Sequence, residues 1–235
     1  MQTWDLYERA VEFDGRRLPH KTAPFSGDRY CIVVYNPDFS FHDRYMTHAH
    51  ERSEELRAMA IAPPTEIARV STDEQKEASA NLLRELQQSR WVSRSGKKSH
   101  EKYAGGDSHT LVFGKTRTRA AYEGKSKARD APANKTHRPL LLALQLYLRA
   151  LIGPRVDEYT GLFVAHNSTS SWHFDRSNVG PSIITCIGEY EGGALLINPE
   201  KRRMLPCYKC KTGNQGARMC REVKMHITPE WWCGE

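Results

Sequence analysis

Two side chains that can bind the same metal ion stand two residues apart in His173-Phe174-Asp175. In an extended strand alternate side chains lie on one face, so the His173 imidazole and the Asp175 carboxylate would point the same way. One imidazole, one carboxylate and a second imidazole make the facial triad that holds Fe(II) and leaves positions open for small ligands. The spacing therefore predicts two of three metal ligands, although a solvated or hydrogen-bonded pair would give the same motif.

The segments around this motif are typical of short strands separated by turns. An apolar and aromatic run occupies 159–165, a polar turn follows at 167–171, and a second apolar run lies at 183–187. A Tyr-x-Gly-Gly-x-Leu sequence then covers 190–195. Alternating apolar runs and polar turns of this length predict a β-rich domain around the two candidate ligands.

From His173 to Leu195 the chain resembles the Fe(II)- and 2-oxoglutarate-dependent dioxygenases. The resemblance implies an α+β protein with a double-stranded β-helix (jelly-roll) core and buttressing helices. It also implies Fe(II) on His173 and Asp175, 2-oxoglutarate as co-substrate and ascorbate as a possible reductant. Members of this family carry a second metal histidine downstream, and about ten residues later an arginine that pairs with the distal carboxylate of 2-oxoglutarate.

The expected downstream histidine and arginine do not follow Asp175. The only later histidine is His226, and no arginine follows it. The matching segment is at the start of the chain, where residues 13–20 and 24–35 resemble the closing hairpin of the same fold. The resemblance thus implies His20 as the third iron ligand and Arg29 as the 2-oxoglutarate anchor, in reversed order along the chain.

The residues around Arg29 support an anion site independently of the family. The run 32–35 is β-branched and aromatic and ends at Asn36-Pro37, as expected for a buried strand. A guanidinium is a rigid planar fork that matches a carboxylate. The family often has Arg-x-Ser here, whereas this chain has Cys31 in the serine position. Tyr159 and Asn178 complete the predicted cofactor-binding residues, although an asparagine in a turn needs no such role.

Two arrangements would explain the reversed order. In a circular permutant, the C-terminal strands of the β-helix occupy residues 1–40. A helical and basic loop-rich insert or linker follows at 41–136. Residues 137–235 then contain a buttress helix, the N-terminal strands of the β-helix and a cysteine-containing tail. In a slice of a tandem array, the tail of one domain would precede the head of the next. A permutant brings His20 to His173 and Asp175, and a slice leaves it apart.

Two helices are predicted in the middle of the chain. A capping-box pattern at 71–74 precedes an apolar stripe over 78–88, and Pro139 precedes a leucine-rich helix over 140–152 that we expect to buttress the sheet. The segment 90–138 is rich in lysine and arginine and is expected to be loop-rich. It is either a solvated surface or a nucleic-acid-binding track.

The cysteines and the remaining histidines offer weaker hypotheses. Zinc could bind Cys207, Cys210 and Cys220 with Cys233 or His226 as the fourth ligand, but free thiols are the simpler expectation. The residues His48 and His50 are expected on a solvated surface.

Composition limits the class of protein. The 235 residues carry a formal net charge of +7, suit one sizeable core and contain no long uncharged apolar stretch, so an intracellular protein, cytoplasmic or nuclear, is expected. The sequence predicts an oxygenase that hydroxylates or oxidatively demethylates an unidentified substrate. The alternative is a non-catalytic fragment or degenerate scaffold that binds nucleic acid.

Overall fold

An apolar run from each end of the chain forms the central strand pair of the fold. In the computed structural model, β4 (Phe25–Tyr35) and β9 (Ser182–Gly192) pair antiparallel from Phe25↔Gly192 to Val34↔Ile183. Their β-branched residues favour extended backbone and pack well on a sheet. The structure describes residues 1–37, 61–91, 109–117, 128–175 and 178–200.

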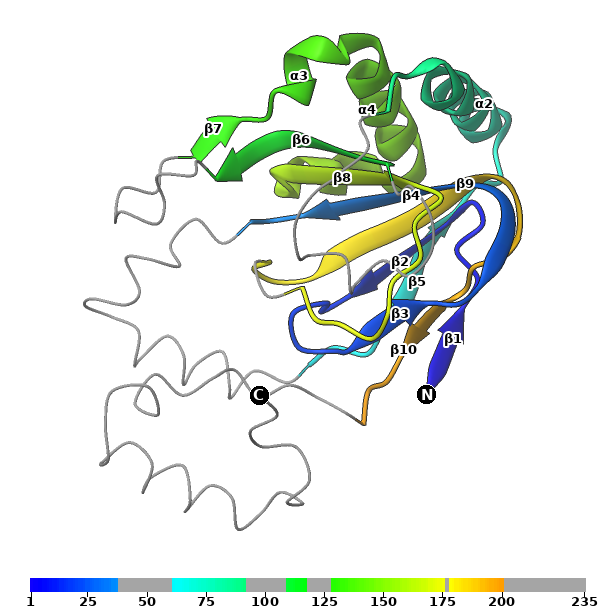
Figure 1. Ribbon diagram of the computed structural model, residues 1–235, viewed down its shortest axis with the longest axis vertical. Coiled ribbons are helices and arrows are strands. Elements are labelled where there is room, and N and C mark those ends of the chain that lie inside the picture. The colour runs from blue at the N-terminus through cyan, green and yellow to red at the C-terminus, as the bar shows by residue number, and fades with distance from the viewer. Residues whose placement is uncertain (38–60, 92–108, 118–127, 176–177, 201–235) are drawn as a thin grey trace. The chain divides into compact units, whose positions relative to one another are not determined.

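The central pair belongs to a seven-stranded antiparallel sheet with the order β5-β2-β9-β4-β8-β6-β7 (Figure 1). The other strands are β5 (Thr65–Arg69), β2 (Arg9–Phe13), β8 (Gly161–His166), β6 (His109–Arg117) and β7 (Ala128–Asp130). A smaller antiparallel sheet has the order β1-β10-β3, with β1 (Gln2–Trp4), β10 (Leu195–Ile197) and β3 (His20–Thr22). Both sheets therefore combine strands from the two ends of the chain.

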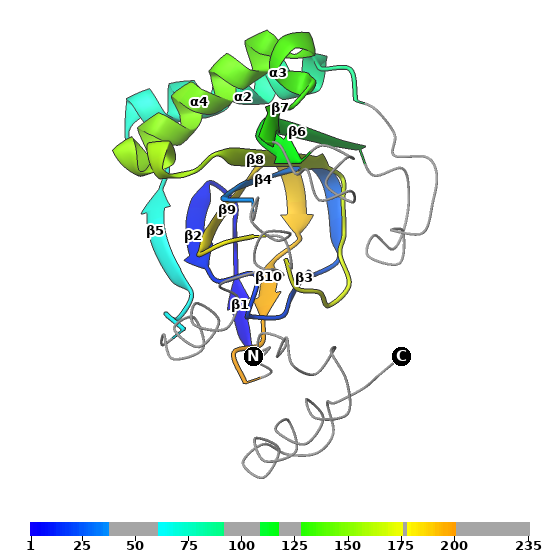
Figure 2. The ribbon, with the colours of Figure 1, turned by 90° about the vertical axis from the view of Figure 1, so that its left-hand side faces the viewer.

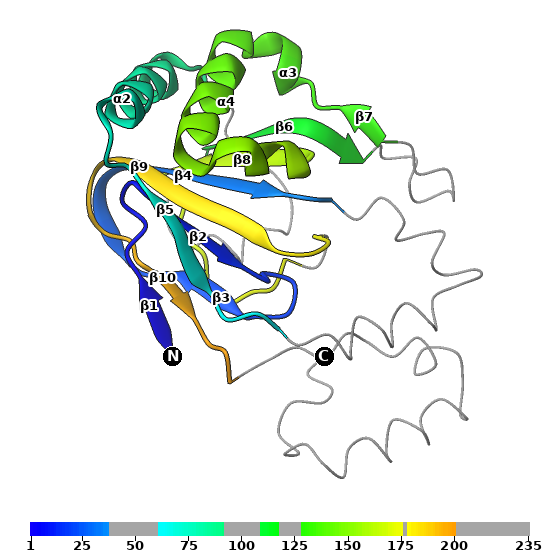
Figure 3. The same cartoon turned by 180° about the vertical axis from the view of Figure 1, so that it is seen from behind.

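Helices cover one face of the large sheet (Figures 2 and 3). They are α2 (Asp73–Gln88), α3 (Ala133–Thr136), α4 (Arg138–Ile152) and the 3₁₀ helix η4 (Gly153–Glu158). The Thr72 side chain caps α2 in a capping box with Gln75, and Pro139 lies in the first turn of α4. Both long helices were predicted, and the structure confirms them.

The core under these helices depends on the inward stripe of α4. Leu144 is fully buried, whereas Leu146 on the same helix is 61% exposed. We expect Leu144→Ala to lower the free energy of unfolding by about 2–5 kcal/mol, because the substitution removes buried apolar surface and leaves a cavity. Urea denaturation of Leu144→Ala and of the matched control Leu146→Ala measures this. Equal losses in the two variants would contradict the described packing.

A second apolar cluster covers the opposite face of the large sheet. Cys31 and Ile184 of the large sheet pack in it with Leu195 and Ile197 of the small sheet. On β4 the alternation is strict, with Tyr30, Ile32 and Val34 in the core under the helices and the intervening side chains on the other face. The described residues thus form three layers, namely helices, large sheet and small sheet.

The predicted α+β class is confirmed, and the large sheet is antiparallel. The prediction that 90–138 is loop-rich was partly wrong, because β6 and β7 lie within it and β6 pairs with β8. Leu111 and Phe113 of β6 are buried. The alternation of apolar and polar residues in β6 is short and has basic residues on both sides, so it did not stand out as a strand. No helix of the described residues is long and apolar enough to cross a membrane.

The predicted closing hairpin is arranged differently. The strands β3 and β4 follow one another in sequence but do not pair, because β3 pairs with β10 in the small sheet and β4 pairs with β8 and β9 in the large one. His48, His50 and the possible zinc ligands from Cys207 to Cys233 lie outside the described residues.

Candidate metal centre

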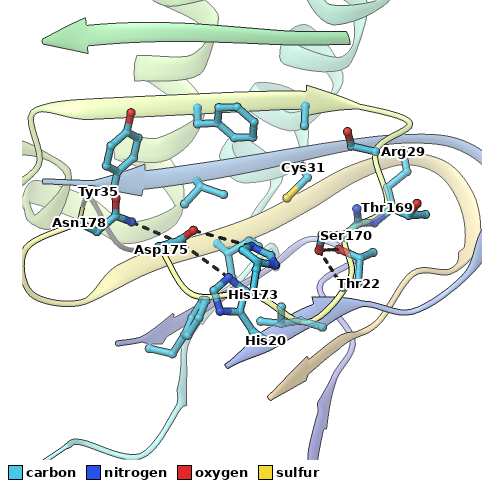
Figure 4. A pocket seen from close by; sticks show the side chains of 17 residues that line it. His20, Thr22, Arg29, Cys31, Tyr35, Thr169, Ser170, His173, Asp175 and Asn178 are labelled. Carbon is cyan, nitrogen blue, oxygen red and sulfur yellow. Dashed lines mark hydrogen bonds and ion pairs between the residues drawn. The ribbon is translucent and has the colours of Figure 1, made fainter. Parts of the chain in front are cut away.

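His20, His173 and Asp175 converge on the wall of a cavity, although 153 residues separate the two histidines (Figure 4). One ligand atom from each side chain lies within 4.8 Å of the other two. The Nε2 atom of His20 is 3.6 Å from Asp175 Oδ2, and Nε2 of His173 is 3.7 Å from Asp175 Oδ1. Two imidazoles and one carboxylate at these separations could hold a metal ion.

Backbone hydrogen bonds hold the two ends of the chain together at this point. The amide of His20 donates to the His173 carbonyl at 3.1 Å, and the amide of His173 donates to the His20 carbonyl at 3.0 Å. The Asp175 amide donates to the Gly15 carbonyl at 2.8 Å. The segment 173–175, predicted as a strand, therefore makes only one isolated bridge, His20↔His173, and the position of each ligand depends on the other.

The hydrogen bonds of both imidazoles suit a metal on Nε2. His20 Nδ1 lies 3.1 Å from the Leu18 carbonyl oxygen, and His173 Nδ1 lies 2.8 Å from the Ser171 carbonyl oxygen. A carbonyl can only accept, so each Nδ1 carries the proton and each Nε2 of a neutral ring presents its lone pair. Such bonds to the remote nitrogen orient metal-binding histidines and fix their tautomer.

Asn178 lies beside Asp175, as the sequence hypothesis required. The Asn178 amide donates to Ser182 Oγ at 3.1 Å and lies 3.5 Å from Asp175 Oδ2, which is long for a hydrogen bond. The Asn178 backbone carbonyl accepts from Arg16 at 3.2 Å. Asn178 therefore packs against the carboxylate and is itself held by two neighbours.

Gly15 is part of the site but was not identified from the sequence. A Cβ atom at this position would lie 2.9 Å from Asp175 Oδ2 and 3.4 Å from His20 Cε1. The only signal was a glycine five residues before His20, which is too common a feature to identify a ligand neighbour.

We expect Gly15→Ala to weaken metal binding by about tenfold or more, because the new methyl group displaces the Asp175 carboxylate from its two histidines. Titration of Co(II) into the metal-free protein measures the affinity. Gly153→Ala is the control. A Cβ at Gly153 would meet no atom within 4 Å, so this substitution adds backbone strain at a positive φ without a clash near the metal ligands. Weaker metal binding in Gly153→Ala alone would contradict the role of Gly15.

The cavity that contains the triad has a volume of about 260 Å³ and lies between the large sheet and β3, β10 and the segment 168–175. Figure 4 shows Arg29, Thr22, Thr169 and Ser170 at one end and the triad farther along. The remaining wall is mostly apolar and is formed by Phe13, Val33, Phe163, Ala165, Ile184 and Leu195. A ligand in this cavity would meet a cation at one end and the candidate metal ligands beyond it.

Arg29 is a buried cation without a carboxylate partner among the described residues. It is 1% exposed, and its guanidinium carbon lies 5.4 Å and 5.6 Å from the ring centres of Phe25 and Tyr190. The Nε atom has no hydrogen-bond partner in the described structure. Burial acts to lower the pKa of Arg29, but Cys186, Cys31 and Tyr190 raise it above its usual value, so the group is charged.

Gly193 makes room for this arginine. A Cβ at Gly193 would lie 2.8 Å from Arg29 Nε, and its φ of +68° favours glycine. Asn167 fixes the Arg29 backbone through two hydrogen bonds. The Asn167 side-chain oxygen accepts from the Arg29 backbone amide at 2.8 Å, and the Asn167 backbone amide donates to the Arg29 carbonyl at 2.9 Å. The Arg29 backbone is therefore fixed, and its side chain has room beside Gly193.

The structure does not place Tyr159 in the cavity. Its hydroxyl donates to Glu12 Oε1 at 3.2 Å, and burial raises its pKa. Tyr159 was predicted to start a strand, but it directly follows η4, and β8 begins two residues later. The side chain consequently packs with the core under the helices, on the other side of the large sheet from the triad.

In the comparisons with known proteins, no family model, curated protein or solved structure matches this chain. Any assignment of function therefore depends on the site itself.

Proposed function

We propose that this protein is an Fe(II)- and 2-oxoglutarate-dependent oxygenase with a single active site built from both ends of the chain. The observation that carries the proposal is the convergence of His20, His173 and Asp175. The sequence motif named two of these residues by their spacing, and the third came from a segment 153 residues away that resembles the closing part of the same fold. If the N-terminal and C-terminal segments belonged to separate sites, there would be no reason for His20 to lie beside His173 and Asp175.

The donor set fits Fe(II). Two neutral imidazoles and one carboxylate on one side of an ion leave the other side open to small ligands, which is the arrangement used for oxygen activation. When bound, iron would supply the oxidising chemistry with O₂ and 2-oxoglutarate. The protein supplies His20 and His173, each oriented by a backbone carbonyl, and the Asp175 carboxylate.

The opposite end of the cavity fits the distal carboxylate of 2-oxoglutarate. Arg29 lines the cavity with a charged guanidinium whose Nε has no hydrogen-bond partner in the described structure, and a carboxylate there would compensate its charge. A volume of 260 Å³ equals the liquid volume of roughly nine water molecules, which suits a small dicarboxylate of about ten non-hydrogen atoms. The apolar wall between the two ends would exclude water from the reacting groups.

The order of the strands supports a permuted double-stranded β-helix. The small sheet faces the large one, and the chain passes from β3 in the small sheet directly to β4 in the large one. Strands β3 and β4 come from the N-terminal segment and β8 to β10 from the C-terminal segment, and they interleave in both sheets. This interleaving favours a permutant over a slice of a tandem array.

The experiment that tests the proposal is succinate formation by the purified chain with Fe(II), ascorbate and 2-oxoglutarate. Uncoupled turnover does not require the substrate that is hydroxylated or demethylated. We expect Fe(II)-dependent succinate in the unmodified protein and a loss of at least about a hundredfold in Asp175→Ala, which lacks one ligand and keeps the backbone amide that donates to Gly15. Absence of succinate from a protein that binds Fe(II) and 2-oxoglutarate would contradict catalysis.

A further inference from the structure

Two thiols face one another on the wall of the cavity. Cys31 of β4 and Cys186 of β9 are direct partners in the antiparallel register, so their side chains lie on the same face of the sheet. Cys31 is 9% exposed and lines the cavity, whereas Cys186 is completely buried beside it. Both are free cysteines.

The backbone hydrogen bonds place this pair at the closer of the two kinds of antiparallel position. The Cys186 amide donates to the Leu6 carbonyl at 3.0 Å, and the Cys186 carbonyl accepts from the Glu8 amide at 2.8 Å. Both polar groups of Cys186 thus point away from β4, and Cys31↔Cys186 is a non-hydrogen-bonded pair. Such pairs have Cα atoms about 4.5 Å apart, which is within the range of roughly 4.4–6.8 Å that a disulfide spans.

The surroundings distinguish the two sulfur atoms. Arg29 precedes Cys31 by two residues on the same face of β4, and Figure 4 shows the Cys31 sulfur between Arg29 and the triad. A hydrogen bond from Cys186 and the charge of Arg29 lower the pKa of Cys31, while burial raises that of Cys186. The other ionisable groups that act on the pair are Tyr190 and Asp175. Cys31 is therefore the nucleophile and Cys186 the thiol beside it.

We propose that Cys31 and Cys186 form a redox-active dithiol, which a hydroperoxide that enters the cavity oxidises to a disulfide. The Cys31 thiolate attacks one peroxide oxygen, the O–O bond breaks, and Cys31 sulfenic acid and hydroxide are formed. The Cys186 sulfur then attacks the Cys31 sulfur, the S–S bond forms, and the sulfenic oxygen leaves as water with the Cys186 proton. In total two thiols and hydrogen peroxide give one disulfide and two waters.

This chemistry needs neither iron nor 2-oxoglutarate, so it can be tested separately from the proposed function. The tryptic peptides 30–44 and 177–201 contain Cys31 and Cys186 respectively, and each of the other four cysteines lies in a different peptide. The metal-free full-length chain is treated with hydrogen peroxide at the concentration of the protein and in tenfold excess, blocked with iodoacetamide and digested. We expect the 30–44 and 177–201 peptides to be linked and to separate on reduction.

Two variants identify the roles. Cys186→Ser should leave Cys31 as a sulfenic acid that dimedone traps, whereas Cys31→Ser should leave Cys186 as a thiol.

A third variant tests the charge beside Cys31. Arg29→Gln should slow alkylation of Cys31 by the anion iodoacetate about tenfold, because both the thiolate and the reagent lose the stabilising cation. Alkylation by neutral iodoacetamide should slow less. Unmodified Cys31 in folded protein after peroxide treatment, or dimedone labelling of Cys186 in preference to Cys31, would overturn the proposal.

Discussion

Replacement of either His20 or His173 by alanine is expected to lower the affinity for Fe(II) by about a hundredfold or more. Each substitution removes one of three donor atoms from the ion, and loss of even an indirect partner of a metal site costs about 10–100-fold. Anaerobic titration with Co(II), followed by its visible absorption, measures the affinity without any turnover. The His20 result is informative because this residue is 153 positions from the H-x-D motif.

The matched control for both variants is His166→Ala. His166 belongs to β8, pairs with Asp28 at 3.2 Å and does not line the cavity, so its removal should leave Co(II) affinity unchanged. Loss of binding in His173→Ala but not in His20→Ala would mean that His20 packs beside the metal without binding it. That result would contradict a metal centre with three protein ligands.

The elements predicted correctly are those determined by nearby residues. The helix α4 followed from its leucine stripe and from Pro139, and α2 from the capping-box pattern at 71–74, although the box itself forms one residue later, between Thr72 and Gln75. The strand β4 followed from a β-branched run that ends at a proline. In each case the residues that determine the helix or strand lie within that element or within a few residues of its ends.

The features that could not be predicted depend on contacts between distant segments. Nothing near Gly15 indicates that Asp175 will lie against it, and nothing near Cys31 indicates that Cys186 will be its cross-strand partner. Tyr159 was misplaced because β8 begins only at Gly161, so the alternation that places Phe163 and Ala165 on the cavity face does not extend to it. The meeting of His20 with His173 was predicted only through a family resemblance, since spacing alone gives no long-range register.

Replacement of Arg29 by glutamine is expected to weaken binding of 2-oxoglutarate by about 10–150-fold, because a charged hydrogen bond in a buried site contributes about 1.5–3 kcal/mol. Arg29→Lys should restore only part of the loss, since an ammonium on a flexible chain does not match both carboxylate oxygens. Calorimetric titration of the Co(II)-loaded protein with 2-oxoglutarate measures the affinity. Arg149→Gln is the control, because Arg149 is an exposed arginine paired with Asp157.

A second ligand shows which end of 2-oxoglutarate Arg29 binds. 2-Oxobutyrate keeps the oxo acid that would reach the metal but lacks the distal carboxylate. In the unmodified protein it should bind more weakly than 2-oxoglutarate by the same 10–150-fold, and in Arg29→Gln the two should bind about equally. If Arg29→Gln weakened both ligands equally, the arginine would act through the shape of the cavity. If Arg29→Gln weakened the binding of neither ligand, Arg29 would not bind the distal carboxylate. Its charge would then act mainly on the Cys31 thiolate beside it.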